Sequence, residues 1–342
     1  MRKKSILSLF ILCLIGIYFM VCGFTFFKRS LKTPKVEVKQ EVVSKNNTSD
    51  VWCITFQLIW NELMDKLQKP VVFEGGNPEL ANELNKKLYT KDLISEKSCY
   101  LADGKISQKL KKKIEKDIYK KFKEKSDILD KIDWNAKETY LFYAMLKKDF
   151  LFLTPFDKLP NQYFNSKDKV KYFGINKKSN HKLYKNVDVV FYNNRNDFAV
   201  KLNTKENEEI ILYRTDKQDS FENLYKKVNK KYYDEFGKDD ILEIPNIDVN
   251  KLISYDVLCG KRIVGTNYVI GQALQTIKFK LDDKGGTLKS EAAMTVMKTS
   301  MPIIRDERYF IFNKPFVLFL REKGKDKPYY AMRIEDAKYL VK

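Results

Sequence analysis

The stretch from Thr276 to Ile334 constrains the fold most, because three different kinds of sequence follow one another in it. Alternating apolar residues predict a β-strand that ends at Gly285-Gly286; they are Ile277, Phe279 and Leu281. The segment from Thr287 to Arg308 then has no fixed period and consists mainly of small, polar and flexible side chains. A structureless loop of this length within a compact domain is usually functional or disordered, and these residues favour a functional loop.

Two apolar runs close the stretch, Phe310 to Leu320 and Pro328 to Ile334, and the charged turn Arg321 to Lys327 separates them. This arrangement predicts a buried hairpin. The side chains expected to be buried are Phe312, Phe316, Leu318 and Leu320.

This part of the chain resembles the carboxy-terminal third of the serpins. The run from Phe310 to Leu320, with its Asn-Lys-Pro-Phe centre, resembles the signature of that family, and Asp282 to Gly285 resembles the end of the strand that feeds the reactive loop. Further segments resemble the central sheet, a strand that ends in Leu-Pro and the opening helix: Thr139 to Asp157, Ile241 to Asn246, and Phe56 to Leu67. Between the opening helix and the central sheet the helical region is shorter than in a typical serpin.

The resemblance implies an α+β fold with a large, mostly antiparallel central sheet, helices, smaller sheets and an exposed reactive loop. A sheet-rich chain with several helices on one side is also an α+β pattern. The pattern further predicts helices over Ser220 to Phe236 and Val249 to Leu258.

The resemblance also implies an inhibitory mechanism, which comes with the family and not from the residues themselves. A protease attacks the exposed loop and forms an acyl-enzyme, and the freed loop inserts into the central sheet as a new strand. The hinge of this loop would be Ser290, Glu291, Ala292 and Ala293. Met294 to Val296 would be the leading part of the inserted strand.

Two ways of counting place the cleaved bond differently. Counting from Asp283 puts it near Thr299, whereas counting from Ser290, or back from Phe312, puts it at Ile303-Ile304. The second position is preferred because two independent counts agree on it. The bond after Arg305 would suit a trypsin-like enzyme and is the other alternative.

The loop departs from the family pattern at its start. Gly286 to Lys289 looks like an insertion ahead of the hinge, and Lys289 stands where the family prefers glycine, so its side chain is expected to stay in solvent. The family opens its sheet at an asparagine and a histidine. The matching positions here are Tyr143 or Ala144, and Gln275.

The net charge of +20, with 65 basic and 45 acidic side chains, favours anionic partners. Most of the basic residues are lysine, which suits base recognition less than arginine, so nucleic acid is not expected. The segment Lys105 to Lys125 predicts an amphipathic helix surrounded by lysines. Either these lysines form a solvated face, or four of them bind a polyanion: Lys111, Lys112, Lys116 and Lys120.

The amino terminus predicts a membrane segment. Three basic residues precede an uncharged apolar run, Ser5 to Phe27, which is long enough to span a bilayer and lacks a small-x-small cleavage site after it. Residues 1–29 are therefore expected to be an anchor or, alternatively, a cleaved signal; residues 30–50 a polar tether; and residues 51–342 the serpin-like domain. The domain would face the outside of the cell, either anchored or secreted.

The residues do not favour catalysis or a metal site. The only histidine is His181, in a polar loop, and a catalytic triad would have to use it. Cys53, Cys99 and Cys259 lack paired metal-ligand spacing, and they leave open either one disulfide or three free thiols. No cofactor is expected.

Two functions remain open. One is a monomeric inhibitor of an extracellular serine or cysteine protease. The other is a non-inhibitory module that binds an anionic polysaccharide or cell-wall polymer.

Overall fold

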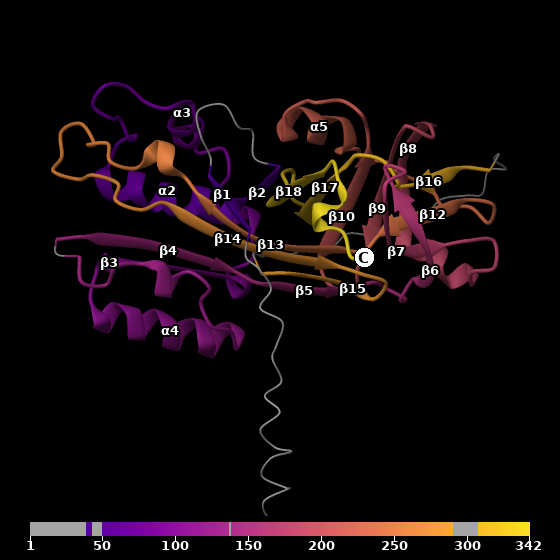
Figure 1. Cartoon of the computed structure of the whole chain (residues 1–342), viewed down its shortest axis with the longest axis horizontal. Coiled ribbons are helices and arrows are strands. Elements are labelled where there is room, and N and C mark those ends of the chain that lie inside the picture. Colours follow the sequence, from indigo (N-terminus) through magenta and orange to yellow (C-terminus); the bar gives the residue numbers. More distant parts are fainter. Residues whose placement is uncertain (1–38, 43–49, 137, 290–306) are drawn as a thin grey trace, which may run out of the picture. The chain divides into compact units, whose positions relative to one another are not determined.

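A computed structural model describes residues 39–42, 50–136, 138–289 and 307–342 of the chain. Its strands form three sheets and one separate pair of strands (Figure 1). The central sheet has the order β1 (Lys39–Val42), β13 (Ile247–Ser254), β14 (Leu274–Leu281), β15 (Gly285–Leu288) and β5 (Lys148–Leu151). Its neighbours are antiparallel except for β1 with β13.

The other strands belong to two further sheets and the separate pair. The seven-stranded sheet has the order β11 (Asp234–Glu235), β8 (Val187–Asn194), β9 (Asp197–Asn203), β10 (Glu208–Arg214), β17 (Phe316–Glu322), β18 (Tyr330–Ile334) and β2 (Val51–Cys53). The four-stranded sheet has the order β16 (Tyr309–Ile311), β12 (Ile241–Pro245), β7 (Asp168–Ile175) and β6 (Asp157–Phe164). The separate pair is β3 (Cys99–Lys105) with β4 (Tyr140–Leu146).

The helices are α2 (Ile54–Leu67), α3 (Glu79–Asn85), α4 (Gln108–Phe122) and α5 (Phe221–Val228). Helices α2 and α4 lie on opposite faces of the central layer, which the central sheet forms with β3 and β4, whereas α5 packs on β17 of the seven-stranded sheet (Figure 1). Helix α4 begins at Ser107, whose hydroxyl accepts a hydrogen bond from the Leu110 amide. Its apolar residues pack with β3 and β4 in a small core of their own, which contains Ile114, Ile118, Phe122, Leu129, Trp134, Tyr143 and Met145. Helix α2 lies on the opposite side of β4 (Figure 1).

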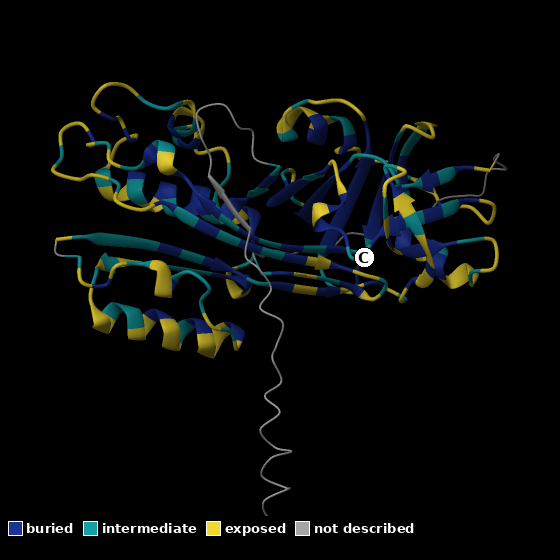
Figure 2. Ribbon diagram, in the orientation of Figure 1, coloured by how far each residue is buried: buried dark blue, intermediate teal, exposed yellow. Residues whose placement is uncertain are grey.

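The buried carboxy-terminal hairpin is confirmed. Strands β17 and β18 are paired, and all four predicted side chains have 0% exposure: Phe312, Phe316, Leu318 and Leu320. Figure 2 shows these strands in the buried interior. The first apolar run divides between two sheets, because its residues before Pro315 belong to or follow β16 in the four-stranded sheet.

Three predicted elements are wrong. The strand predicted to end at Gly285-Gly286 ends at Leu281, and these glycines begin β15. The helix expected over residues 220–236 is only α5, and the helix expected over residues 249–258 is mainly strand β13. Strand β13 escaped detection because a charged residue, Lys251, fills one of its buried positions and pairs with Asp50, 201 residues away in sequence.

Four residues expected in the tether also form structure. Strand β1 (Lys39–Val42) pairs in parallel with β13 at the edge of the central sheet. The expected α+β class, with a large antiparallel sheet and smaller sheets, is confirmed by the strand order.

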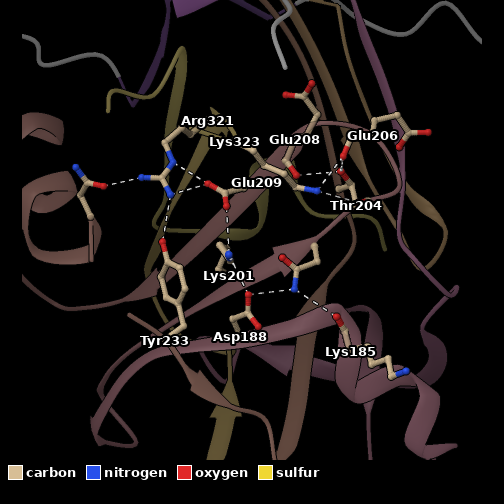
Figure 3. A network of polar contacts seen from close by, with 12 residues as sticks. Lys185, Asp188, Lys201, Thr204, Glu206, Glu208, Glu209, Tyr233, Arg321 and Lys323 are labelled. Atoms are coloured by element: carbon tan, nitrogen blue, oxygen red, sulfur yellow. Dashed lines mark hydrogen bonds and ion pairs between the residues drawn. The ribbon is translucent and has the colours of Figure 1, made fainter. Parts of the chain in front are cut away.

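Buried charges of the seven-stranded sheet are paired with one another, as burial requires. The Arg321 guanidinium donates to Glu209 at 2.6 and 2.8 Å, and Lys201 lies 3.2 Å from the other oxygen of Glu209 and 2.9 Å from Asp188. Figure 3 shows Glu209 between the two cations. This network joins β17, β10, β9 and β8 and is structural.

Candidate functional site

The candidate site is a gap in the central layer between β4 and β14. Strand β4 continues into β5 after the single residue Lys147. Next to β5 lies β15, which in turn pairs with Phe279–Leu281 of β14. Next to β4, by contrast, no strand of the described residues fills the corresponding place, and β4 pairs only with β3. The edges of β4 and of residues 274–278 of β14 therefore face each other across the gap.

Two neighbouring cavities occupy this gap. A cavity of about 110 Å³ is lined by residues 141–146 of β4 and 272–276 beside or within β14, and Lys289 lies on its wall. A larger cavity of about 530 Å³ is lined by residues 138–142 and 267–273. Its wall is mainly apolar and includes Phe56, Ile59, Trp60, Ile132 and Ile270.

Gln275 fixes the wall of the smaller cavity. Its side-chain amide donates to the Cys53 carbonyl at 3.1 Å and to the Thr55 hydroxyl at 2.7 Å, and it accepts from the Tyr255 hydroxyl at 2.7 Å. Burial raises the pKa of Tyr255 well above its ordinary value, so the phenol stays a donor. The Tyr255 ring also stacks on Phe56 at 3.8 Å. These contacts hold the Gln275 side chain in place at the wall of the gap.

The two other residues expected at the sheet opening lie on β4. Ala144 lines the smaller cavity across from Gln275. Tyr143 belongs to the core under α4, and its hydroxyl donates to Ser126 at 3.3 Å. Both residues thus line the smaller cavity together with Gln275, and Tyr143 also packs in the core under α4.

Strand β15 enters the sheet through glycines. A Cβ atom on Gly285 would lie 2.1 Å from the Phe150 carbonyl oxygen, and one on Gly286 would lie 2.6 Å from that of Lys280. Both positions therefore exclude any side chain. Leu288, the last residue of β15, is fully buried.

Lys289 follows β15, and the expectation that its side chain stays in solvent is wrong. The side chain is only 15% exposed and lies within 3.5 Å of Glu124 and 3.3 Å of Asp127. Its amine also donates to the Lys125 carbonyl at 2.8 Å. Sequence reasoning missed these partners because they lie more than 160 positions away.

The other loop residues singled out from the sequence lie outside the described part of the chain and stay predictions. They are Ser290, Glu291, Ala292 and Ala293 of the hinge, and Thr299, Ile303, Ile304 and Arg305 near the cleaved bond. The described chain resumes at Glu307, just before β16.

The lysines predicted to bind a polyanion lie on α4 but differ in availability. Lys111 lies 2.6 Å from Asp130 and 3.9 Å from Glu115. Lys112, Lys116 and Lys120 are exposed.

The remaining candidate residues form no second site. His181 is exposed at the start of a short 3-10 turn. The described residues contain no group of three metal-ligating side chains, and Cys53, Cys99 and Cys259 are free thiols. No helix in the described ranges is long and apolar enough to cross a membrane.

A buried charge cluster lies directly behind the end of β15. Lys148 stands opposite Leu288 on β5, and its amine lies 2.5 Å from Glu208 and 3.6 Å from Glu322. The Tyr329 hydroxyl donates to Glu208 at 2.6 Å. Burial raises the pKa of Glu208 to about 7, although Lys148 and Tyr329 partly offset this rise.

This pKa makes stability depend on pH. Folded Glu208 keeps its proton up to about pH 7, whereas the unfolded chain releases it near pH 4.5. The folded state thus binds more protons in this window, and the free energy of unfolding should fall by about 3 kcal/mol as the pH rises through it. Glu208→Gln should remove this fall, measured by urea unfolding between pH 5 and 8.

Glu322→Gln is the matched variant, because it removes the other carboxylate that contacts Lys148. It should lower the pKa of Glu208 and move the fall in stability to lower pH. An unchanged slope in Glu208→Gln would show that another group titrates.

No protein-family model and no curated protein matches this sequence. Similar solved structures include the serpin Serpin48 of the insect Tenebrio molitor, at 12% identity and a TM-score of 0.42, covering 80% of this chain and 78% of the other. Human thyroxine-binding globulin is similar at 12% identity and a TM-score of 0.45, covering 86% and 94%. Human kallistatin is similar at 10% identity and a TM-score of 0.45, covering 84% and 91%. Strand β14 is followed by β15, and after Lys289 the described chain resumes at Glu307, just before β16.

Proposed function

We propose that this protein inhibits a protease by inserting its cleaved loop into the gap between β4 and β14. The observation that carries the proposal is β15, which lies between β5 and β14 and ends where the gap between β4 and β14 begins. The inhibitor would act on an extracellular serine or cysteine protease, with residues 5–27 anchoring the domain to a membrane or directing its secretion.

The register of β15 predicts where the following residues would go. Leu288 lies opposite Phe279 on β14 and opposite Lys148 on β5. Continuing both ladders residue by residue would place Ala292 opposite Gln275 on one side and Ala144 on the other. The hinge predicted from the sequence would therefore run along the smaller cavity, whose wall includes the small residue Ala144.

Side-chain alternation agrees between the two ladders. Leu288, Phe279 and Lys148 all point into the interior, so Ser290, Ala292 and Met294 would point the same way. Met294 would then reach the level of Phe142, which lines the larger, apolar cavity. Small residues would enter the smaller cavity, and apolar residues would fill the larger one.

The chemistry would follow the ordinary course of acyl transfer. The protease's serine or cysteine attacks the carbonyl carbon of the scissile residue, for which Ile303 is preferred and Thr299 and Arg305 are alternatives. An ester or thioester forms, the peptide C–N bond breaks, and the new amine leaves with a proton. Insertion of the loop before water hydrolyses the acyl-enzyme would trap the protease.

The test is a search for a covalent complex. Incubation with serine and cysteine proteases should give a band on denaturing gels at the summed mass, and mass spectrometry of the released peptide should locate the cut. Complete cleavage without such a band across the panel would favour a non-inhibitory domain.

One observation favours a second function, binding of an acidic polysaccharide or cell-wall polymer. Lys109, Lys112, Lys116 and Lys120 are exposed and follow one another at helical spacing along the outer face of α4. Like charges at this spacing weaken a helix by about 0.2–0.5 kcal/mol per pair, and a bound polyanion would relieve that repulsion.

Changing these four lysines to Gln should abolish retention on an acidic-polymer column at low salt, with little change in folding. A matched variant changes four lysines elsewhere: Lys158, Lys169, Lys178 and Lys261. Equal loss of retention in both variants would mean that only the net charge of the protein matters.

A further inference from the structure

Three lysines lie in a row across the central layer where β15 ends. Lys278 belongs to β14, Lys289 follows β15, and Lys147 joins β4 to β5. The Lys289 amide donates to the Lys278 carbonyl at 3.3 Å, so this residue already continues the β15 ladder. Neighbouring strands are about 4.8 Å apart, and like charges directly opposite each other destabilise a sheet. Lys289 therefore needs counter-charges to remain there.

The segment after α4 supplies these counter-charges. One oxygen of Asp127 lies 2.6 Å from Lys278 and the other 3.3 Å from Lys289. Glu124 likewise contacts two lysines, Lys147 at 3.0 Å and Lys289 at 3.5 Å. Each carboxylate thus bridges Lys289 to one of its two neighbours.

Local structure holds this segment in place. The Ser126 hydroxyl accepts hydrogen bonds from the amides of Ile128 and Leu129, which forms a tight turn, and it also accepts from the Tyr143 hydroxyl of β4. The carboxylates are therefore presented by a turn fixed to β4. Burial opposes the charge of Glu124, but the hydrogen bond from Lys147 and the nearby Lys289 lower its pKa overall, so it is ionised at neutral pH.

We propose that Glu124 and Asp127 are positioning residues that hold Lys289 within the central sheet and so keep the loop seated at the start of its insertion path. This inference rests on the proposed function for its consequence, but the clamp itself belongs to the intact protein. It explains how a lysine occupies a position where a small residue would be expected. It also makes the seating of the loop depend on the segment that follows α4.

The clamp is tested in the full-length, uncut protein by hydrogen exchange at the amides of Thr287, Leu288 and Lys289. Asp127→Asn should speed exchange there about tenfold, which corresponds to about 1.4 kcal/mol. Asp130→Asn is the matched control, because Asp130 pairs with Lys111 away from the gap, and it should leave exchange unchanged. In a Lys289→Gln background the Asp127 effect should shrink to less than about twofold, as expected for a double-mutant cycle.

Salt gives an independent measurement. Raising the ionic strength from about 0.05 to about 0.5 M should speed the same exchange in the natural protein but not in Lys289→Gln. Equal exchange in Asp127→Asn and Asp130→Asn, or an Asp127 effect that persists without Lys289, would overturn the clamp.

A second arm separates the clamp from the proposed function. After the loop is cut, the natural protein should gain thermal stability, and Asp127→Asn should gain it about tenfold more slowly. Normal gain in the natural protein with an equal rate in the variant would overturn the clamp and leave the inhibitor. No gain in any variant would overturn insertion, and the exchange measurements would still decide the clamp.

Discussion

A single cut between Thr299 and Arg305 is expected to raise the melting temperature by at least about 10 °C, because insertion would pair the open edges of β4 and β14. Burial of Met294 and Val296 would stabilise the protein by about 1.5–3 kcal/mol each. One kcal/mol shifts the melting temperature of a large domain by roughly 2–4 °C. Differential scanning calorimetry of cut and intact protein measures this rise.

A charge placed in the smaller cavity should prevent this rise in melting temperature. Ala292→Glu would force an unpaired carboxylate between Gln275 and Ala144, where burial of a charge is very costly. Ser300→Glu is the matched control, because the extended register carries Ser300 beyond the first residue of β4. A cut natural protein that melts at or below the intact form would contradict insertion, since ordinary nicking only adds chain freedom.

Phe316→Ala is expected to lower the free energy of unfolding by about 3–5 kcal/mol, as for other large core truncations. The ring is fully buried in β17, and it lies 5.2 Å from the Phe312 ring and 6.3 Å from the Phe164 ring, so its loss would open a cavity between two sheets. Urea unfolding at constant pH measures the loss. Phe316→Leu should cost less than about 1.5 kcal/mol, because it conserves most of the volume.

A loss below about 1 kcal/mol for Phe316→Ala would contradict the central place of β17 in the core. If the hairpin stabilises the whole domain, Phe316→Ala should still unfold in a single transition.

Local patterns in the sequence were sufficient for several elements. The alternation at Ile277, Phe279 and Leu281 predicted β14, and the fourfold spacing of apolar residues predicted α4 and its buried face. The apolar run around Phe316 predicted a buried strand. These predictions succeeded because strand and helix periodicities depend on residues close together in the chain.

The candidate site could be predicted only in part. The sequence indicated a functional loop and, at the sheet opening, Gln275 with either Tyr143 or Ala144, but it did not predict that the loop's first residues form β15. A short Gly-Gly-Thr-Leu segment has no strand pattern of its own. It becomes a strand because the edges of β5 and β14 offer it hydrogen-bonding partners on both sides.

Tertiary structure also decided how far two lysines are withdrawn from solvent. Lysines are expected in solvent, so Lys251 concealed strand β13, and the side chain of Lys289 was expected to stay exposed. Lys251 is buried and Lys289 is only 15% exposed, because carboxylates from distant segments neutralise them: Asp50 for Lys251, and Glu124 and Asp127 for Lys289. Periodicity within the chain thus determined which segments are strands and helices. Pairing across the chain decided which charges can leave water, because a buried charge is tolerated only where its counter-charge is brought beside it.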